Sequence, residues 1–476
     1  MDIFVGAGLV PAHVMIIDKF YVKIVVSSKN MEIPKHIFRA YDIRGLLDEV
    51  TPDIARVVGM ALVSKTGAKT VIVGRDMRAT SPELEAAAIE GITSMGANVI
   101  AIGLCSTSMF NFAVSSQEHI DAGIMITASH NPPEFNGMKM ALASGLPISG
   151  LEILEEIKKC IVAGDVRKGN VTEQDILAAY IDKCLAVENL PDLSGTKLVI
   201  DYGNGMGAMS VRELCKRLNV EVIELYPEPD ARFPNHEANP AKEDTLADVK
   251  AAVLRENADF GVALDGDADR VGFIDNEGVS LRGDLTLALL AKETLSRKPG
   301  SKVVVAPNQS WTTFESILEN GGVPLECRIG RKFVVEAVQK QGAVLGGEVS
   351  SHFFFEEFHG LEAVDHAIVR ILSIWEQSGQ TFAEMVRPYR TYTNSGEVNI
   401  EVHNKEEVQD KLEQYVGIAS KVNKLDGIRC EFDHDWWFIV RPSNTEPLLR
   451  LIVEASSREL MEQKRDELVA FIGGNT

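Results

Sequence analysis

The chain has 476 residues, which is too long for one ordinary core, so its length predicts three or four domains. Hydrophobic residues (45%) and charged residues (25%) are close to globular averages, which argues against extended disorder. The 48 Lys and Arg against 69 Asp and Glu give a net charge of −21, so the surface repels nucleic acids and anionic membranes at long range. A phosphorylated substrate would be repelled as well, so an enzyme for such a substrate must gather its Arg and Lys locally.

Cysteine spacing and hydropathy favour a cytoplasmic protein outside the membrane. The six cysteines form no CxxC pair, which is typical of free thiols and argues against a disulfide framework or a zinc site. No run approaches the roughly 18 apolar residues that a membrane span needs. Asp2 stands where a signal peptide would carry positive charge, so we interpret residues 1–30 as an extension and Met31 as the natural start of the core.

Three stretches repeat one pattern: a short β-branched run, a loop rich in Gly, Asp or Asn, and then helical periodicity. The runs are Thr70–Val73, Leu198–Ile200 and Lys302–Val305. Continuous apolar runs of this kind are typical of buried parallel strands with helical crossovers. Thr51-Pro52 and Ser81-Pro82 each predict the start of a helix, with the hydroxyl residue as N-cap.

After about Arg390 the pattern changes to alternating strands and a helix rich in Glu and Lys, which indicates a smaller α+β domain. The predicted fold class is therefore α/β, with three successive α/β domains containing mixed sheets followed by this C-terminal domain. The expected divisions are an extension (1–30) and domains at 31–176, 177–279, 280–391 and 392–476.

The first motif that could take part in catalysis is Thr127-Ala128-Ser129-His130-Asn131-Pro132, directly after the apolar run Gly123–Ile126. It places a serine hydroxyl at the carboxyl edge of a sheet, where α/β proteins bind ligands. For Ser129 alone, a plain polar turn is the commoner explanation. Lys139 follows closely enough to fold back over the same loop.

The second motif is Asp265-Gly266-Asp267-Ala268-Asp269-Arg270, after the apolar run Phe260–Leu264. Alternate carboxylates on a tight loop converge on one point, which suits a hard cation with oxygen ligands. An EF-hand is excluded because Arg270 and Asn276 stand where its loop needs Gly and Glu. Two alternatives remain: a phosphatase whose aspartate carries the phosphate, and a solvated acidic turn. Three carboxylates this close repel one another without a cation, which disfavours the acidic turn.

Two further motifs offer sugar and phosphate ligands. In Gly347-Glu348-Val349-Ser350-Ser351-His352, Glu348 and Ser350 stand two apart and face the same side of an extended loop, but a surface turn explains this motif equally well. Arg441-Pro442-Ser443-Asn444-Thr445-Glu446-Pro447, with Arg450 beyond, combines arginine, hydroxyls and turn amides into a candidate phosphate cradle. Arg331, Lys332 and Arg44 are further candidate cations.

Together these motifs resemble the α-D-phosphohexomutase family, in particular its phosphomannomutase/phosphoglucomutase branch. The resemblance covers residues 37–455 and includes Ile37-Phe38-Arg39-Ala40-Tyr41-Asp42-Ile43-Arg44-Gly45, Gly74-Arg75-Asp76-Met77-Arg78 and Phe233-Pro234-Asn235-His236. It implies four domains around a central cleft. It also implies reversible transfer of phosphate between the 1 and 6 positions of a hexose phosphate, through a phosphoserine and a hexose 1,6-bisphosphate intermediate.

The resemblance also implies roles for individual residues. Ser129 would carry the phosphate and, with Asp265, Asp267 and Asp269, would bind Mg²⁺. The residues expected to transfer protons or stabilise charge are Arg44, His130, Lys139 and His352. The residues expected to bind the sugar or the phosphate that is not transferred are Arg270, Arg331, Lys332, Glu348, Ser350, Arg441, Ser443, Asn444, Thr445 and Arg450.

The partners expected from the resemblance are small hexose phosphates, with no nucleic acid and no membrane. The expected assembly is a monomer or a small homo-oligomer. The Glu348 and Asn444 motifs favour mannose or glucose phosphate. Phosphoglucosamine mutase is the alternative enzyme, and a non-catalytic sugar-phosphate binding protein is the alternative of another class. Ala268, where many relatives have Gly, departs from the family pattern. The polar stretch Arg390–Asn394 has no strand or helix pattern and is the expected hinge of the last domain.

Overall fold

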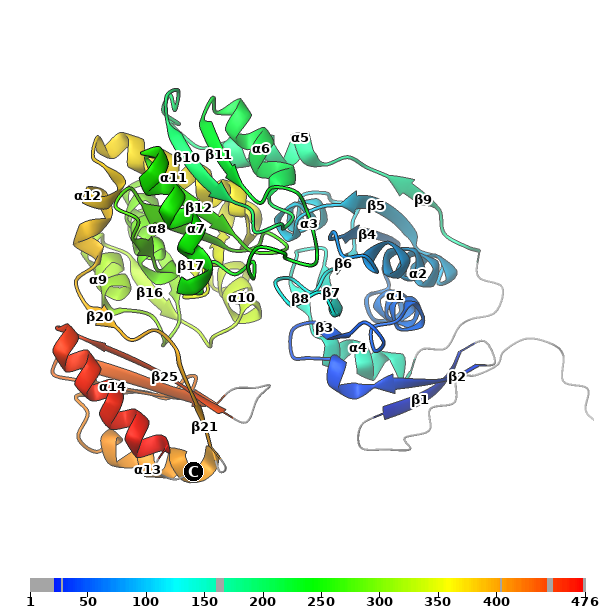
Figure 1. Cartoon of the computed structure of the whole chain (residues 1–476). Coiled ribbons are helices and arrows are strands. Elements are labelled where there is room, and N and C mark those ends of the chain that lie inside the picture. The colour runs from blue at the N-terminus through cyan, green and yellow to red at the C-terminus, as the bar shows by residue number, and fades with distance from the viewer. Residues whose placement is uncertain (1–20, 27–28, 160–166, 403–404, 443–447, 474–476) are drawn as a thin grey trace, which may run out of the picture.

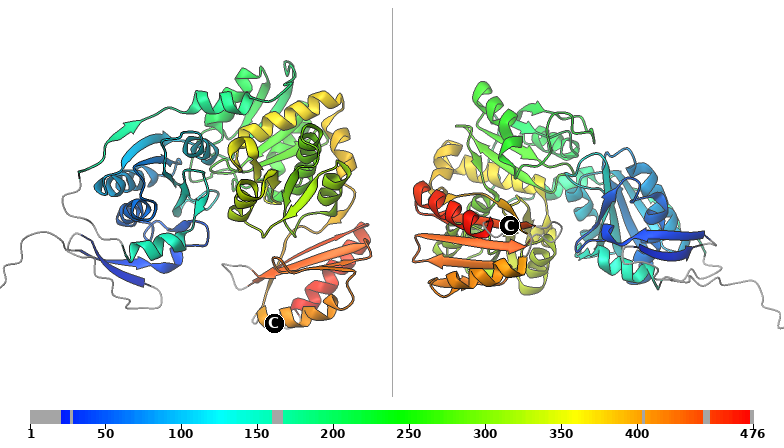
Figure 2. Two further views of the ribbon diagram at one scale, coloured as in Figure 1. Left: turned by 180° about the vertical axis from the view of Figure 1, so that it is seen from behind. Right: turned by 60° about the horizontal axis from the view of Figure 1, so that its bottom comes forward.

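The computed structural model describes residues 21–26, 29–159, 167–402, 405–442 and 448–473. They form four successive domains, each built on its own sheet, arranged in chain order around an arc (Figure 1). The first domain lies at one end of the arc and the smaller fourth domain at the other, as both further views show (Figure 2). The predicted fold class is confirmed: three domains have mixed sheets with helices, and the last is α+β.

The first domain contains a mixed sheet in the order β3-β7-β6-β4-β5-β9, with β8 paired to β7. Its strands are β3 (Ile43–Leu46), β4 (Thr70–Arg75), β5 (Asn98–Leu104), β6 (Ala122–Ile126), β7 (Phe135–Leu142), β8 (Pro147–Ile148) and β9 (Val171–Glu173). Its helices are η1 (Lys35–Ile37), α1 (Pro52–Thr66), α2 (Ser81–Ser94), α3 (Thr107–Ser115) and α4 (Gly150–Ile157).

The two predicted helix starts differ in how they are capped. Thr51 caps α1 as predicted, because its hydroxyl accepts from the Ile54 N–H. The prediction for Ser81 was wrong by one position, since Thr80 is the N-cap residue of α2. The Ser81 hydroxyl instead donates to the buried carboxylate of Asp76 at 2.6 Å, which draws it away from the helix end.

The second and third domains have sheets in the orders β11-β10-β12-β13-β14 and β16-β15-β17-β18-β19. The second contains α5 (Leu177–Leu185), β10 (Lys197–Asp201), α6 (Ala208–Arg217), β11 (Glu221–Leu225), η2 (Glu243–Leu246), α7 (Ala247–Glu256), β12 (Phe260–Leu264), β13 (Val271–Asp275) and β14 (Ser280–Leu281). The third contains α8 (Gly283–Arg297), β15 (Lys302–Val305), α9 (Trp311–Glu319), β16 (Val323–Glu326), α10 (Arg331–Gln341), β17 (Ala343–Gly347), β18 (Phe353–Phe355), η3 (Glu356–Phe358), β19 (Leu361–Glu362), α11 (Val364–Ser378), α12 (Phe382–Val386) and η4 (Arg387–Tyr389).

One strand arrangement is repeated in all three sheets. A first strand (β4, β10 or β15) lies between two parallel neighbours, and the later of these (β6, β12 or β17) pairs with an antiparallel strand. The loops after β6, β12 and β17 are therefore topologically equivalent. We call them the serine loop (127–134), the aspartate loop (265–270) and the glutamate loop (348–352). Because β6 and β12 are buried along their whole length, each loop begins at a fixed point in a core.

The fourth domain is an antiparallel sheet in the order β20-β25-β24-β23-β22, with β21 paired to β25. It contains β20 (Thr393–Asn394), β21 (Val398–Glu401), α13 (Lys405–Val416), β22 (Lys421–Asn423), β23 (Ile428–Phe432), β24 (Trp436–Pro442), β25 (Leu448–Ala455) and α14 (Arg458–Gly473). The expectation that Arg390–Asn394 has no strand was wrong for its last two residues. They pair with Glu454 and Ala455 and so already belong to the sheet of the fourth domain.

Glu454 joins the fourth domain to the third. This carboxylate is fully buried, and its Oε1 accepts hydrogen bonds from the Ser310 hydroxyl (2.9 Å), the Trp311 N–H (3.0 Å) and the Trp437 indole (2.9 Å). Its Oε2 accepts from Arg282 and Asn394. These contacts stabilise the docked position of the fourth domain, because undocking would remove the donors that Ser310, Trp311 and Arg282 supply to the carboxylate.

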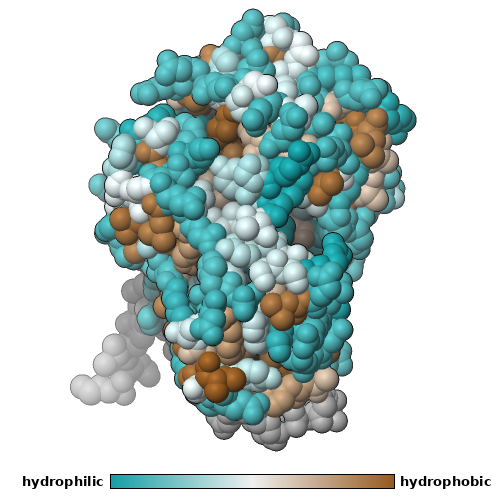
Figure 3. All heavy atoms as spheres, turned by 90° about the vertical axis from the view of Figure 1, so that its left-hand side faces the viewer, coloured by the Kyte–Doolittle hydropathy of each residue, from teal (hydrophilic) through white to brown (hydrophobic). Residues whose placement is uncertain are grey.

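The surface and the thiols agree with the composition. Hydrophilic residues cover most of the face seen in Figure 3, with apolar residues scattered among them. Among the described residues, no helix has both the length and the apolar character needed to cross a membrane. The cysteines of the described part are free and buried: Cys105, Cys184, Cys215, Cys327 and Cys430.

We predict that a chain beginning at Met31 keeps the melting temperature of the full chain within about 2 °C. Strands β1 (Tyr21–Val26) and β2 (Lys29–Pro34) form a separate two-stranded sheet, and such a hairpin is marginally stable by itself. A chain beginning at Lys35 also loses the fully buried Ile33 and should melt at a lower temperature. Scanning calorimetry of the three chains checks this, and equal losses in both shortened chains would show that β1 stabilises the core.

Candidate active site

Ser129 lies in the serine loop in a strained conformation. The φ angle of Ser129 is 55°, and only 4% of the residue is exposed. Its N–H donates to the Thr127 hydroxyl at 2.8 Å. A positive φ is uncommon for residues other than glycine and persists only where the surroundings enforce it. The result is that the Ser129 hydroxyl lies 3.1 Å from Oδ2 of Asp265 and 3.2 Å from Nδ1 of His130.

Arg78 enforces the shape of the serine loop. This side chain is buried, and its guanidinium donates to the backbone carbonyls of Ser129, Asn131, Pro132 and Phe135 at 2.5 to 3.0 Å. A planar group with five fixed donors is well suited to hold several carbonyls in one geometry. Arg78 therefore holds the backbone of the serine loop, including that of Ser129 itself.

The aspartate loop brings Asp265, Asp267 and Asp269 together beside Ser129. All three are buried, and one carboxylate oxygen from each lies within 4.8 Å of those of the other two. The loop turns at Ala268, whose φ of 52° is in the left-handed region that favours glycine, so the departure noted at this position carries a backbone cost. At Gly266 a Cβ would lie 2.6 Å from the Ser129 carbonyl oxygen, so glycine allows the two loops to touch.

The donor set fits a divalent cation such as Mg²⁺. Oδ1 of Asp267 is buried and has no hydrogen-bond partner among the described residues. Buried carboxylate oxygens of this kind are expensive unless they are paired or ligate a metal. Burial and the charges of Asp269 and Asp267 raise the pKa of Asp265 well above its ordinary value, which shows how strongly the cluster resists full ionisation without compensating charge.

Lys139, on β7, supplies part of that compensation. Its ammonium lies 2.7 Å from Oδ2 of Asp267 and 2.6 Å from Oδ2 of Asp269. Burial would lower the pKa of Lys139, but the charges of Asp267 and Asp269 outweigh burial and raise it. The lysine is therefore a fixed cation, and the contacts of its ammonium are with the aspartate loop.

Two more predicted residues flank the serine. The Arg44 guanidinium donates to Oδ1 of Asn131 at 2.8 Å and to Oδ2 of Asp42 at 2.6 Å, so it is positioned beside the serine loop. Burial, and then the charges of Arg270 and Arg44, lower the pKa of His130 well below its ordinary value. The imidazole beside Ser129 is therefore neutral at physiological pH.

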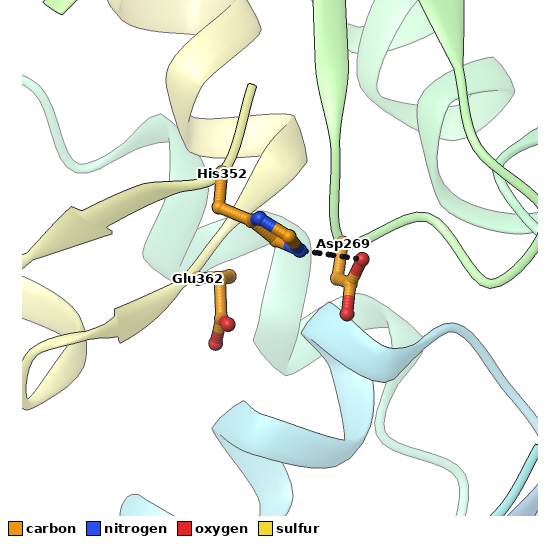
Figure 4. A group of neighbouring side chains, drawn as sticks. All are labelled: Asp269, His352 and Glu362. Carbon is orange, nitrogen blue, oxygen red and sulfur yellow. Dashed lines mark ion pairs between the residues drawn. The ribbon is translucent and has the colours of Figure 1, made fainter. Parts of the chain in front are cut away.

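The glutamate loop is joined to the aspartate loop through His352. Nδ1 of this imidazole lies 3.0 Å from Oε2 of Glu348 and 2.9 Å from the Ser350 hydroxyl, which confirms that Glu348 and Ser350 face the same side. Nε2 lies 3.3 Å from Oδ1 of Asp269, and Figure 4 shows the ring directed at that carboxylate. The Nε group of Arg270 lies 3.3 Å from the same Nε2. His352 thus joins Glu348 and Ser350, the expected sugar ligands, to Asp269, an expected metal ligand.

Asp269, His352 and Glu362 also form a compact group, with candidate ligand atoms within 4.8 Å of one another (Figure 4). Ion pairs explain this group without a metal. Arg331 donates to both carboxylate oxygens of Glu362, at 2.5 and 2.8 Å, and Lys332 lies 3.4 Å from Glu152. Both cations expected to meet substrate therefore already have carboxylate partners.

Arg441 and Arg450 lie directly opposite each other on β24 and β25. Both contact Glu397, at 3.7 and 3.2 Å respectively. Arg441 and Arg450 thus place two adjacent guanidinium groups near one carboxylate, an arrangement that can accept a phosphate. The expected ligands Ser443, Asn444 and Thr445 lie outside the described residues.

Comparison with known sequences gives matches along nearly the whole chain. Profiles for α/β/α domains I, II and III of phosphoglucomutase/phosphomannomutase match residues 35–168, 178–278 and 282–392, and the profile for the C-terminal domain matches residues 397–471. The chain belongs to the phosphoglucomutase/phosphomannomutase family.

Individual family members agree with this assignment. The phosphomannomutase of Escherichia coli K12 is 34% identical over 91% of this chain and 98% of its own, and the phosphoglucomutase of Neisseria gonorrhoeae is 36% identical over 93% and 98%. A crystal structure of a phosphoglucomutase/phosphomannomutase family protein from Burkholderia thailandensis superposes with a TM-score of 0.85 at 30% identity, covering 93% of this chain and 98% of that one.

Two residues of this phosphoglucomutase/phosphomannomutase family member were missed as part of the site. Arg78 lies in one of the motifs that carried the resemblance, but nothing in the sequence indicated that its guanidinium reaches the serine loop. Thr107 directly follows the N-cap residue of α3, and its hydroxyl donates to Oδ2 of Asp267 at 2.6 Å. The only available signal was its place just after β5, at the carboxyl edge of the first sheet.

The pH dependence of stability tests the His352 bridge. Burial would lower the pKa of His352, but Asp269 and Glu348 outweigh it and raise the pKa to about 9, against about 6.5 in an unfolded chain. A raised pKa means that the imidazolium stabilises the fold fully below about pH 6.5 and that this stabilisation is lost as the pH rises through about 9. The melting-temperature advantage of the wild type over His352→Gln should therefore be large at pH 6 and small at pH 10.

The matched control is His119→Gln, at an exposed histidine of the same domain as Ser129, which should show no such trend. A difference between wild type and His352→Gln that stays constant from pH 6 to pH 10 would contradict the bridge.

Proposed function

We propose that this protein is a phosphohexomutase that moves phosphate reversibly between the 1 and 6 positions of a hexose phosphate, with Ser129 as the phosphate carrier. The observation that carries the proposal is the Ser129 hydroxyl, held 3.1 Å from Asp265 at the edge of three buried carboxylates. The relatives named phosphomannomutase and phosphoglucomutase support the reaction class.

The division of labour follows from the chemistry. Phosphoryl transfer needs alignment and charge neutralisation more than covalent activation by the protein. Phospho-Ser129 gives its phosphoryl group to the free hydroxyl of the bound sugar phosphate, which produces a hexose 1,6-bisphosphate. After the bisphosphate turns over in the site, its other phosphate returns to Ser129 and the isomeric monophosphate leaves.

Asp265, Asp267 and Asp269, with the phosphoserine, would hold the Mg²⁺. When bound, the ion offsets negative charge that develops on the transferring phosphoryl group. Lys139 keeps two of the carboxylates ionised and aligned through its 2.6 and 2.7 Å contacts. Arg44, whose guanidinium donates to Asn131 of the serine loop, adds a further positive charge beside that loop.

The sugar hydroxyls would bind Glu348 and Ser350, whose shared contact with His352 holds them on one side of the loop. The same pair must accept the sugar in both orientations, because either the 1 or the 6 position faces Ser129. His352 contacts both this pair and Asp269, and we infer that it exchanges a proton with the reacting sugar hydroxyl.

The phosphate that is not transferred would bind Arg441 and Arg450. The paired strand positions of Arg441 and Arg450, with Glu397 at 3.7 and 3.2 Å, support this proposal. Releasing and binding the bisphosphate again requires the fourth domain to move, and Arg390–Tyr392, before β20, is the proposed hinge.

The preferred sugar is mannose or glucose phosphate in this proposal, with glucosamine phosphate as the alternative. Parallel assays of mannose-, glucose- and glucosamine-1-phosphate, each with a trace of the corresponding bisphosphate, decide among them. Turnover of none of the three would support the alternative of a non-catalytic sugar-phosphate binding protein.

Ser129→Ala should lower mutase turnover by at least about a thousandfold, or ~4 kcal/mol of barrier, because it removes the carrier while leaving the metal ligands in place. Ser296→Ala, at an exposed serine on α8, is the control and should keep full activity. A rate for Ser129→Ala within about tenfold of the wild type would refute the carrier assignment.

Arg441→Ala should raise KM by about tenfold or more and lower kcat less, because the grip on the phosphate that is not transferred is the same in the ground state and the transition state. It should also release more free bisphosphate during turnover. Arg458→Ala, at an exposed arginine on α14 of the same domain, is the matched control. A collapsed kcat with unchanged KM would instead place Arg441 at the reacting phosphate.

A further inference from the structure

We propose that Thr107 is a positioning residue for the metal site: its hydroxyl fixes the Asp267 carboxylate so that one oxygen is presented to Mg²⁺. The inference rests on the metal site in the proposed function and assigns a role to a residue of α3 whose hydroxyl and N–H both donate to Asp267. Thr107 and Asp267 belong to different domains, so their contact also joins the carrier domain to the metal-binding loop.

The two oxygens of Asp267 differ sharply in their surroundings. Oδ2 accepts from the Thr107 hydroxyl at 2.6 Å, from the Lys139 ammonium at 2.7 Å and from the Thr127 hydroxyl at 3.4 Å. Oδ1 is buried and has no hydrogen-bond partner in the described parts of the chain. Three donors on one oxygen hold the carboxylate plane, and the other oxygen is the one left to ligate a cation. Hydrogen bonds to the outer oxygen of a ligating carboxylate orient the ligand and contribute to metal affinity.

The backbone of the same segment holds the rest of the loop. The Thr107 N–H donates to the Asp267 carbonyl at 2.8 Å. The hydroxyl of the next residue, Ser108, donates to the carbonyl of Ala268 at 2.9 Å, at the point where the loop takes its left-handed turn. Thr107 and Ser108 are themselves buried. The first turn of α3 thus contacts consecutive residues of the aspartate loop, and a shift of α3 would move the carboxylate.

α3 also reaches the third domain, which gives it a fixed position. The Ser108 hydroxyl accepts from the Val364 N–H at 3.2 Å, and the Asn111 amide donates to Oε2 of Glu362 at 3.1 Å. Asn111 in turn accepts from Arg331 at 3.2 Å. The Arg331–Glu362 pair therefore has a structural role besides any role in substrate binding. It anchors α3, the helix that orients Asp267.

The direct test is the affinity of the full-length protein for Mn²⁺, measured from the electron paramagnetic resonance signal of the free ion in preparations matched for phosphorylation by intact mass. Thr107→Val removes the hydroxyl and keeps the shape of the side chain, so Kd for Mn²⁺ should rise about tenfold, at the low end of the 10- to 100-fold range for such contacts, since Lys139 still holds Oδ2. The Mg²⁺ concentration for half-maximal activity should rise in parallel. Thr107→Ser, which restores the donor, should bind Mn²⁺ like the wild type.

Thr312→Val is the matched control, since Thr312 is also buried but its hydroxyl has no hydrogen-bond partner among the described residues. It should leave Kd unchanged. Thr107→Ala serves as a second hydroxyl deletion if Thr107→Val does not fold. Wild-type affinity in the deletion variant, or equal weakening in Thr107→Ser, would overturn the inference while leaving the metal site intact. Absence of any Mn²⁺ site in the wild type would overturn the metal assignment in the proposed function as well.

Discussion

The repulsion among Asp265, Asp267 and Asp269 is the constraint on which the rest of the site depends. Two unit charges about 4 Å apart repel by about 4 kcal/mol at an effective dielectric constant near 20, so three buried carboxylates are stable only with fixed cations and donors around them. Lys139 comes from the first domain and Arg270 from the aspartate loop itself. Because the chain as a whole has a net charge of −21, these local positive groups also decide where a phosphorylated substrate can approach.

The fold meets this constraint by repeating one strand arrangement three times. The serine, aspartate and glutamate loops each follow a buried parallel strand and precede an antiparallel one, so each presents its polar residues at the same edge of its sheet. The proposed carrier, metal ligands and sugar ligands therefore come from equivalent positions in three domains. The contacts that join them cross domain boundaries: Ser129 to Asp265, Lys139 to Asp267, and Asp269 to His352. The fourth domain lacks this arrangement and would supply phosphate ligands that have to move.

The sequence predicted what lies within single motifs and missed what depends on distant partners. Ser129, Asp265 and Glu348 each follow a recognisable apolar run, so the loops and the fold class followed from local pattern. Arg331 has its carboxylate partner 31 residues away and Lys332 has its partner 180 residues away, so their ion pairs could not be predicted. The roles assigned to the site residues stay predictions, which the proposed variants test.

The central claim is that the phosphate is carried by Ser129 and that the aspartates bind metal. The most direct measurement is to incubate the protein with hexose 1,6-bisphosphate, remove the ligand, and locate the covalent phosphate by intact mass and peptide mapping, with and without hydroxylamine. The account predicts one phosphate on the peptide that contains Ser129, stable to hydroxylamine because it is a serine ester. A hydroxylamine-sensitive phosphate on the peptide that contains Asp265 would contradict the account and establish an aspartyl carrier instead.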